Sequence, residues 1–243
     1  MNYINCATRL ILNGALEIIW TLIDLSGSMN LDDWSPSRKA GAVAANKELI
    51  RVKAENYPTD RMGIIGFGTN AEVLHTPVLV STGAQSLCRA LDCVESMGKT
   101  NITEALELAE NELLSTREDF DLCGTIKKVS TSLTDFIYGM QSNEHQTSDS
   151  CEKEKVTKRL ILLSDGDHNA TGRSPVKRAT ILKSAGIVID CIGIGGYPSD
   201  IDEETLKKIA SINPDGSIRY CFIGDKQQLI RKYETLAYHI RPA

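Results

Sequence analysis

Two short apolar runs, each leading to a carboxylate and then to glycine or hydroxyl residues, dominate the hydrophobic pattern of this chain. The first occupies residues 18–23 and leads to Asp24, and the second occupies residues 160–163 and leads to Asp165. Apolar runs of this length between turn residues indicate strands that are buried on both faces of a parallel sheet. The polar residues then follow the carboxyl ends of the strands, where open α/β sheets place their ligand sites. We therefore expect a functional site at this edge of the sheet.

Strand patterns and helix patterns alternate along most of the remaining chain. Further strands are predicted at residues 61–67, 71–79, 187–192 and 218–223, and helices at residues 35–55, 83–95, 101–114, 171–183, 201–210 and 226–239. Ser35 and Pro36 suit the N-cap and first position of the first helix, and a tight turn at residues 68–70 predicts a hairpin. The pattern predicts an α/β fold: a doubly wound, mostly parallel, Rossmann-like sheet with one antiparallel edge strand and helices on both faces.

One long segment, at about residues 115–158, interrupts this alternation, so we predict a single domain over residues 1–243 that carries an insertion. Apolar residues spaced by three or four positions, from Leu122 to Ile137, indicate an amphipathic helix. A polar stretch at residues 141–150 follows and is expected to be mobile. The helix either packs on the domain or forms a second contact with a partner. Because the insertion joins a helix to the start of a strand, we expect its ends opposite the Asp24–Asp165 edge, where it cannot cover the site.

Composition and charge narrow the class of function. The net charge of −5 argues against nucleic acid as a partner, because phosphate binding requires a clustered basic surface. Apolar runs fall short of the roughly 20 residues that span a bilayer, and the N-terminal region lacks the features of a signal peptide. The seven cysteines are scattered and contain no C-x-x-C pair, so neither a zinc site nor a disulfide framework is indicated. We expect a cytoplasmic protein without a membrane span.

The predicted site combines carboxylates and hydroxyls from three distant segments. Alternate positions in an extended turn point the same way, so Asp24, Ser26 and Ser28 can face one point. Thr100 precedes a predicted helix at the same edge, and Asp165 follows the second apolar run. Such an all-oxygen set suits Mg²⁺, with Mn²⁺ or Ca²⁺ as alternatives. Zinc and copper are disfavoured because the set contains neither histidine nor cysteine.

These residues carry a family resemblance. The sequence Asp24-Leu25-Ser26-Gly27-Ser28, with Thr100 and Asp165-Gly166, resembles the metal-ion-dependent adhesion site of von Willebrand factor type A domains, which is also found in integrin I domains. The resemblance implies that both serines and the threonine contact the metal, and that both aspartates bind it directly or through water. It further implies a position left open for an Asp or Glu side chain of a partner protein. The function that it implies is a metal-dependent protein-binding module, not an enzyme.

Alternative functions stay open at this point. Some intracellular members of that family serve as adaptors of an AAA+ ATPase or chelatase-like machine, or belong to kinase–phosphatase stress-response systems. In another class, a Mg²⁺-dependent phosphohydrolase would use Asp24 as its nucleophile, although serines replace the second acid that such enzymes generally use. Three more residues are candidates for the rim of the site, namely Lys99, Asp167 and His168. Trp34 is either exposed toward a partner or buried.

Overall fold

A computed structural model describes residues 16–115, 156–166 and 173–238 of the chain. Its centre is a six-stranded sheet with the order β3-β2-β1-β4-β5-β6. The strands are β1 (Glu17–Asp24), β2 (Arg61–Phe67), β3 (Ala71–Leu79), β4 (Thr157–Ser164), β5 (Val188–Ile194) and β6 (Tyr220–Ile223). Only β3 runs antiparallel to its neighbour, and it lies at one edge. The predicted fold class, including the antiparallel edge strand, is confirmed.

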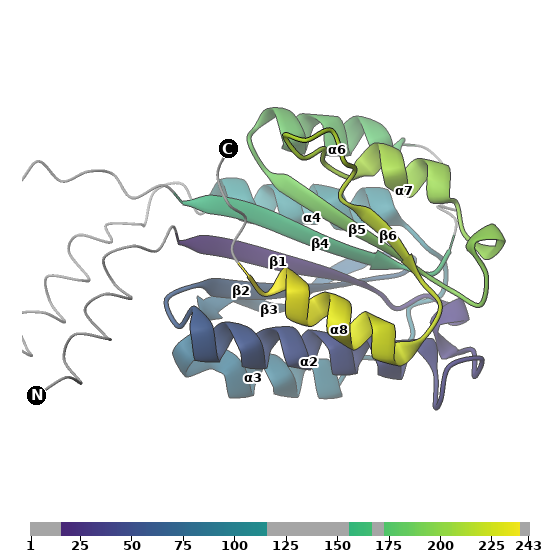
Figure 1. Ribbon diagram of the computed structural model, residues 1–243, viewed down its shortest axis with the longest axis horizontal. Helices are drawn as coiled ribbons and strands as arrows, with labels where there is room; N and C mark the ends of the chain where they lie inside the picture. The colour runs from purple at the N-terminus through teal and green to yellow at the C-terminus, as the bar shows by residue number, and fades with distance from the viewer. Residues whose placement is uncertain (1–15, 116–155, 167–172, 239–243) are drawn as a thin grey trace, which may run out of the picture.

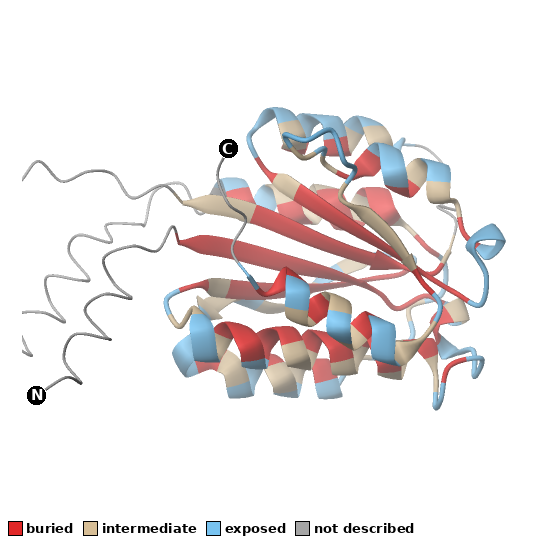
Figure 2. Cartoon of the chain, viewed as in Figure 1, coloured by how far each residue is buried: buried red, intermediate tan, exposed pale blue. Residues whose placement is uncertain are grey.

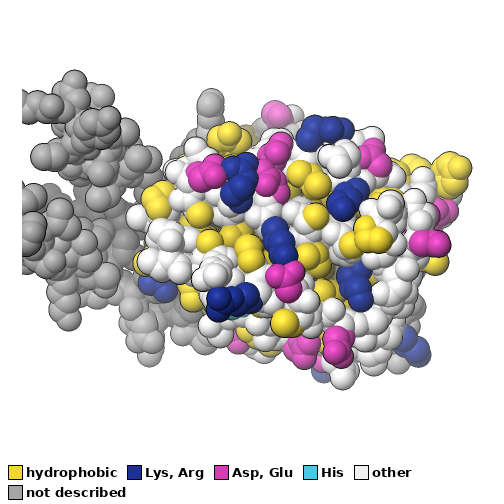
Figure 3. Space-filling model, turned by 90° about the horizontal axis from the view of Figure 1, so that it is seen from below, with side chains coloured by type: hydrophobic (Ala, Val, Ile, Leu, Met, Phe, Trp, Pro, Cys, Tyr) yellow, Lys and Arg dark blue, Asp and Glu magenta, His cyan; other side chains and the backbone are white. Residues whose placement is uncertain are grey.

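Helices cover both faces of the sheet (Figure 1). One face is covered by α2 (Arg38–Asn56), α3 (Val80–Asp92) and α8 (Lys226–Leu236), and the other by α4 (Ile102–Ser115), α6 (Pro175–Ser184) and α7 (Glu203–Ile209). Two short 3₁₀ helices, η1 (Gly27–Asn30) and η2 (Pro198–Asp200), follow β1 and β5. Figure 3 shows basic and acidic side chains interspersed on the face seen from below, without a continuous basic surface there. Among the described residues, no helix combines the length and the apolar character needed to cross a bilayer.

The central strand β1 is buried along its whole length because helices pack on both sides of it (Figure 2). Its side chains alternate between two cores: Ile19 and Ile23 face α2 and α8, whereas Trp20 and Leu22 face α4 and α6. Trp20 lies beside Gly63 of β2, where a methyl group would approach the indole to 2.6 Å. Glycine at residue 63 therefore leaves the space in the core that the Trp20 indole occupies.

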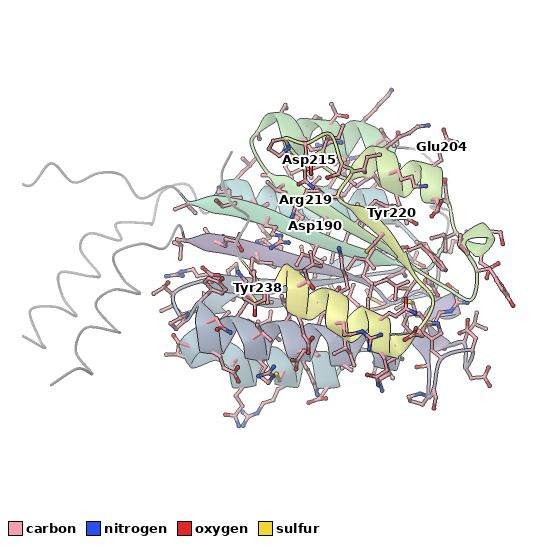
Figure 4. The ribbon with its side chains drawn as sticks, in the orientation of Figure 1. Asp190, Glu204, Asp215, Arg219, Tyr220 and Tyr238 are labelled. Carbon is pink, nitrogen blue, oxygen red and sulfur yellow. The ribbon has the colours of Figure 1, made fainter. Side chains whose placement is uncertain are left out.

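Ion pairs hold the amino-terminal ends of the strands together. Lys53 contacts Glu17 over 2.7 Å and Asp60 over 2.6 Å, and each of these side chains is at most 1% exposed. Asp190 of β5 pairs with Arg159 of β4 over 2.7 Å. Asp190 also pairs over 2.9 Å with Arg219, the residue before β6, and Figure 4 labels both of these residues. This edge is thus closed by buried charges, and the opposite, carboxyl edge carries the predicted site.

One local prediction needs correction, and the structure decides between the two alternatives for Trp34. The N-cap of α2 is Ser37, whose hydroxyl accepts a hydrogen bond from the N–H of Ala40, and not Ser35. Trp34 is only 4% exposed and lies in the core beneath α2, so it is not available to a partner. The predicted insertion has its residues 116–155 outside the described part of the chain. Its described flank at Thr157 pairs with Glu17, at the edge opposite Asp24.

Candidate metal centre

The loop after β1 carries the first three predicted site residues. Asp24 is the last residue of β1 and has no exposed surface. Its Oδ1 accepts a hydrogen bond from the backbone N–H of Ser26 over 2.8 Å, which turns the chain sharply at the end of the strand. Ser26 then occupies the N-cap position of η1 without a side-chain capping bond, and Ser28 lies within η1. One carboxylate and two hydroxyls are therefore held within a single short turn.

The two serine hydroxyls converge on Asp165. Their Oγ atoms lie 3.1 Å apart. Ser28 donates a hydrogen bond to Oδ1 of Asp165 over 2.8 Å, and the Ser26 hydroxyl lies 3.5 Å from the same oxygen. Because β1 and β4 are parallel neighbours, the residues that follow them meet at one point although about 140 positions separate them. The structure thus brings together the two halves of the predicted site.

Thr100 reaches the same place from the loop between α3 and α4. Backbone hydrogen bonding joins this loop to the first one, since the N–H of Gly27 donates to the carbonyl of Gly98 over 2.8 Å. Gly98 adopts a φ of +80°, a left-handed conformation that favours glycine. A methyl group at Gly166 would lie 3.3 Å from Oγ1 of Thr100 and 3.8 Å from Oγ of Ser28. All five predicted residues therefore meet at the carboxyl edge of the sheet.

The two carboxylates are costly to bury together. Burial raises the pKa of Asp24 to about 6, and repulsion from Asp165 acts in the same direction. Burial likewise raises the pKa of Asp165, although hydrogen bonds from Ser28 and the nearby charge of Arg38 oppose the effect. A divalent cation between these groups would offset both the desolvation and the repulsion. The electrostatics therefore fit a metal.

The donor chemistry points to a hard cation. Within the described ranges no group of three or more His, Cys, Asp or Glu side chains is arranged to hold a metal ion, so a cation here would depend on hydroxyls as well as carboxylates. Neutral oxygen donors with few charges suit Mg²⁺, Mn²⁺ or Ca²⁺ better than zinc. The site residues are also held in place, because Asp24, Ser26, Thr100 and Asp165 are each at most 2% exposed. The residues present fit such a cation.

Sequence reasoning missed three residues that support the site. The hydroxyl of Ser164 donates to Oδ2 of Asp24 over 2.6 Å. Arg38 donates from Nη1 to Oδ2 of Asp165 over 3.1 Å, and its Nε and Nη2 bind Asp33. The parallel register, in which Ile23 faces Leu163, was the signal that could have revealed Ser164. No local signal singles out Arg38, because its contact with Asp165 spans 127 positions.

The rim of the site is defined only in part. Lys99 is exposed, and its backbone N–H donates to the Thr69 hydroxyl over 3.0 Å. Two further rim candidates, Asp167 and His168, lie outside the described residues. The loop after β5 reaches the same edge, since a methyl group at Gly196 would lie 3.5 Å from Oδ2 of Asp33.

Fold and site together define an open α/β domain with oxygen donors gathered at the carboxyl ends of its central strands. Comparison with known families gives this class a name. The model of the von Willebrand factor type A domain matches residues 19–168, and a second model of the same description matches residues 125–232. The chain therefore belongs to the von Willebrand factor type A domain family, whose members often mediate metal-dependent protein interactions.

Individual relatives are distant. The chain is 25% identical over 212 residues to the UPF0353 protein of Mycobacterium sp. (strain KMS), a match that covers 81% of this chain and 53% of that protein. The chain thus spans about half the length of this relative. Equal matches occur in Mycobacterium sp. strains JLS and MCS.

Solved structures show the same fold at low identity. A von Willebrand factor type A protein from Catenulispora acidiphila superimposes with a TM-score of 0.64 at 17% identity, covering 93% of this chain and 42% of that one. Proximal thread matrix protein 1 of the mussel byssus, with zinc in its MIDAS motif, gives 0.59 at 20% identity, covering 92% and 45%. An aerotolerance-related membrane protein from Bacteroides fragilis gives 0.56 at 17% identity, covering 91% and 99%.

Proposed function

We propose that this chain is a metal-dependent protein-binding module. In this proposal Asp24, Ser26, Ser28, Thr100 and Asp165 hold a divalent cation, which is Mg²⁺ with Mn²⁺ or Ca²⁺ as alternatives. The bound cation would supply a positive centre for an Asp or Glu side chain of a partner protein, because hydroxyl ligands leave much of its charge uncompensated. The chain's own residues fix the positions of the donors and exclude water from the carboxylates.

The convergence on Asp165 carries this proposal. Two hydroxyls from the loop after β1 lie within 3.5 Å of one carboxylate oxygen on the residue after β4. An ordinary structural role would not require two buried acids and three hydroxyl groups at one point, since repulsion and desolvation act against it. The byssus protein with zinc in its MIDAS motif supports a divalent cation in this family. The all-oxygen donors of this chain favour a harder ion than zinc.

The surroundings of Asp24 support a binding role over an enzymatic one. A phosphohydrolase would need this carboxylate as an accessible nucleophile. Both of its oxygens instead accept hydrogen bonds, from the Ser26 N–H and the Ser164 hydroxyl, and the side chain has no exposed surface. We therefore propose that the chain is not an enzyme and that Asp24 acts only as a ligand or as a support for the ligands.

Two further parts of the proposal concern the partner and the compartment. The segment at about residues 115–158 is proposed as a second contact with the partner. We also propose a reducing compartment, the cytoplasm, which agrees with the free thiols of Cys88, Cys93, Cys191 and Cys221. Nucleic acid and membrane lipid are not part of the proposed interaction.

Direct cation binding tests the proposal without knowledge of the partner. Isothermal titration with MgCl₂ would compare the wild type with Ser26→Ala and Asp24→Ala. We expect the wild type to bind one Mg²⁺ and both variants to lose at least about tenfold in affinity, because each lacks one oxygen donor. Ser184→Ala is the matched control, since the hydroxyl of Ser184 bonds only locally to the carbonyl of Ile181 at the end of α6.

Partner capture tests the second half of the proposal. Proteins retained by the wild type in Mg²⁺ should be released by EDTA and should not be retained by Ser26→Ala. The control Ser184→Ala should retain them as the wild type does. Retention at full strength by Asp24→Ala, with EDTA equally without effect, would remove the metal-dependent function.

A further inference from the structure

Arg38 lies where a cation would not be expected from local structure alone. It is the first residue of α2, and that first turn contains no acidic residue. A positive charge at the amino-terminal end of a helix is unfavourable, because the helix dipole is positive there. The Arg38 side chain is also only 7% exposed. Its position therefore requires a reason from outside its own helix.

The contacts of Arg38 supply that reason. Its Nη1 lies 3.1 Å from Oδ2 of Asp165, the carboxylate on which both serine hydroxyls converge. Its Nε and Nη2 bind both oxygens of Asp33, with a shortest distance of 2.7 Å. Asp33 is 34% exposed, whereas the Asp165 side chain is not exposed at all. Arg38 thus connects the buried acid of the site to a second acid at the surface.

The charges around the site explain what the guanidinium does. Asp24 and Asp165 place two buried carboxylates close together, since Ser26 contacts both, through its N–H to Asp24 and through its hydroxyl to Asp165. Arg38 is the cation that contacts this pair directly among the described residues, through Asp165. Arginine keeps its charge at every physiological pH, so this compensation is permanent. A divalent cation entering the site would meet a carboxylate whose Oδ2 already contacts a positive charge.

We propose that Arg38 is a built-in counter-cation of the metal site, which neutralises Asp165 when no metal is bound and weakens the affinity for divalent cations when metal is present. The inference rests on the proposed function and deepens it, because it assigns to one residue the control of how tightly the cation is held. Asp33 reduces the effect of Arg38 on cation affinity, because its carboxylate also pairs with the guanidinium and offsets part of the positive charge. The site is thereby kept stable without metal and able to exchange it.

Variants of Arg38 and Asp33 should change Mg²⁺ affinity in opposite directions. Removing the positive charge in Arg38→Gln should tighten Mg²⁺ binding by about tenfold or more, as expected for a unit charge several ångströms away in a partly buried setting. Removing the negative charge in Asp33→Asn should weaken it by several-fold. Arg38→Lys keeps the charge and should stay within about threefold of the wild type. General damage to the fold would weaken binding in every variant.

Arg51 offers a matched control on the same helix. It also bridges two carboxylates, Glu48 and Glu55, but it is 53% exposed and lies away from the site. Arg51→Gln changes the net charge of the chain by the same amount as Arg38→Gln. We expect it to leave Mg²⁺ affinity unchanged, which would separate the local effect from a change in overall charge.

Thermal unfolding gives a second readout that needs no partner. In EDTA, Arg38→Gln should melt below the wild type, because Asp165 loses its counter-charge next to Asp24. Saturating Mg²⁺ should raise the melting temperature of Arg38→Gln by more than it raises that of the wild type, because tighter binding to the folded state stabilises it more.

The possible outcomes distinguish a failure of the counter-cation role from a failure of the proposed metal-binding function. If the wild type and all variants fail to bind Mg²⁺ or Mn²⁺, the proposed function is wrong and this inference falls with it. If the wild type binds Mg²⁺ but folded Arg38→Gln binds equally or more weakly, the counter-cation role is overturned and the metal site stands. Should Arg38→Gln not fold, Asp33→Asn decides, and unchanged affinity there overturns the inference.

Discussion

Ser164 and Asp24, the last residues of two neighbouring parallel strands, are joined by a hydrogen bond of 2.6 Å between the serine hydroxyl and Oδ2 of the aspartate. Both side chains have no exposed surface. The bond satisfies the oxygen of Asp24 that the Ser26 N–H does not reach. It therefore fixes the carboxylate in the orientation that the loop after β1 requires.

Ser164→Ala should destabilise the chain, because it leaves one oxygen of a buried carboxylate without its partner. A buried acceptor left without its hydrogen bond costs about 1–3 kcal/mol. Urea unfolding in EDTA would measure the loss. The exposed Ser184→Ala, whose hydroxyl bonds within its own helix, should change the unfolding free energy by less than about 0.5 kcal/mol. Equal effects of the two substitutions would show that the bond does not hold Asp24.

The metal-free chain should become less stable as the pH rises through the range in which Asp24 ionises. Its pKa is about 6 in the folded chain, against an ordinary value of 3.8, because burial disfavours the charged form. The folded state therefore holds the proton more tightly than the unfolded state, and the free energy of unfolding falls between about pH 4 and pH 6. The full difference corresponds to roughly 3 kcal/mol and is constant above this range.

Asp24→Asn isolates this contribution, since asparagine stays neutral at every pH. We expect the unfolding free energy of the wild type minus that of the variant to decrease up to pH 6 and then to stay constant. Both would be measured in EDTA from pH 4 to pH 8. Mg²⁺ should stabilise the wild type at pH 7 more than it stabilises the variant. A difference that stays flat from pH 4 to pH 8 would contradict the ionisation of a buried Asp24.

The strands and their order of appearance could be predicted because each is a short apolar run between turn residues. The bounds of β2 agree with the predicted residues 61–67. Helix ends were predicted less well, since the start of α2 depends on the conformation of the preceding loop. Ser37 rather than Ser35 makes the capping bond there, and both lie among similar residues.

The candidate site was predictable as far as its residues follow strand ends directly. Asp24 and Asp165 occupy such positions, and the spacing of Ser26 and Ser28 ties both to the first loop. Its supporting charges were not predictable, because Arg38 meets Asp165 only through tertiary packing across 127 positions. Burial of Trp34 was not predictable either, since it depends on the packing of the indole against Gly41 of α2.

Thr21→Val should leave the chain equally stable or stabilise it. The hydroxyl of Thr21 is buried in β1 and has no hydrogen-bond partner among the described residues. Valine has the same shape without the cost of burying a polar group, so a gain of up to about 1 kcal/mol is expected. Thr103→Val is the contrasting substitution, because the hydroxyl of Thr103 donates a hydrogen bond to the carbonyl of Arg173 over 2.8 Å. Loss of this bond should lower the free energy of unfolding by about 1 kcal/mol. Urea unfolding of the two variants would show the opposite signs.

Lys53→Met should be among the most destabilising single substitutions in the chain. The Lys53 ammonium lies within 2.7 Å of both Glu17 and Asp60, and none of the three side chains is more than 1% exposed. Methionine fills the same volume but removes the positive charge between two buried carboxylates. Breaking a buried ion pair in this way costs about 3–5 kcal/mol, because an uncompensated charge stays behind.

The surface pair of Lys208 and Glu204 provides the comparison for Lys53. It has similar geometry, but the two side chains are 56% and 80% exposed, so solvent screens the charges. Lys208→Met should therefore leave the unfolding free energy nearly unchanged. The double variant Glu17→Gln with Lys53→Met should recover part of the lost unfolding free energy, because one of the two unpaired buried carboxylates is then neutral. If Lys53→Met were as mild as Lys208→Met, the amino-terminal ends of the strands would not depend on buried charge, and apolar packing by α2 alone would hold that edge closed.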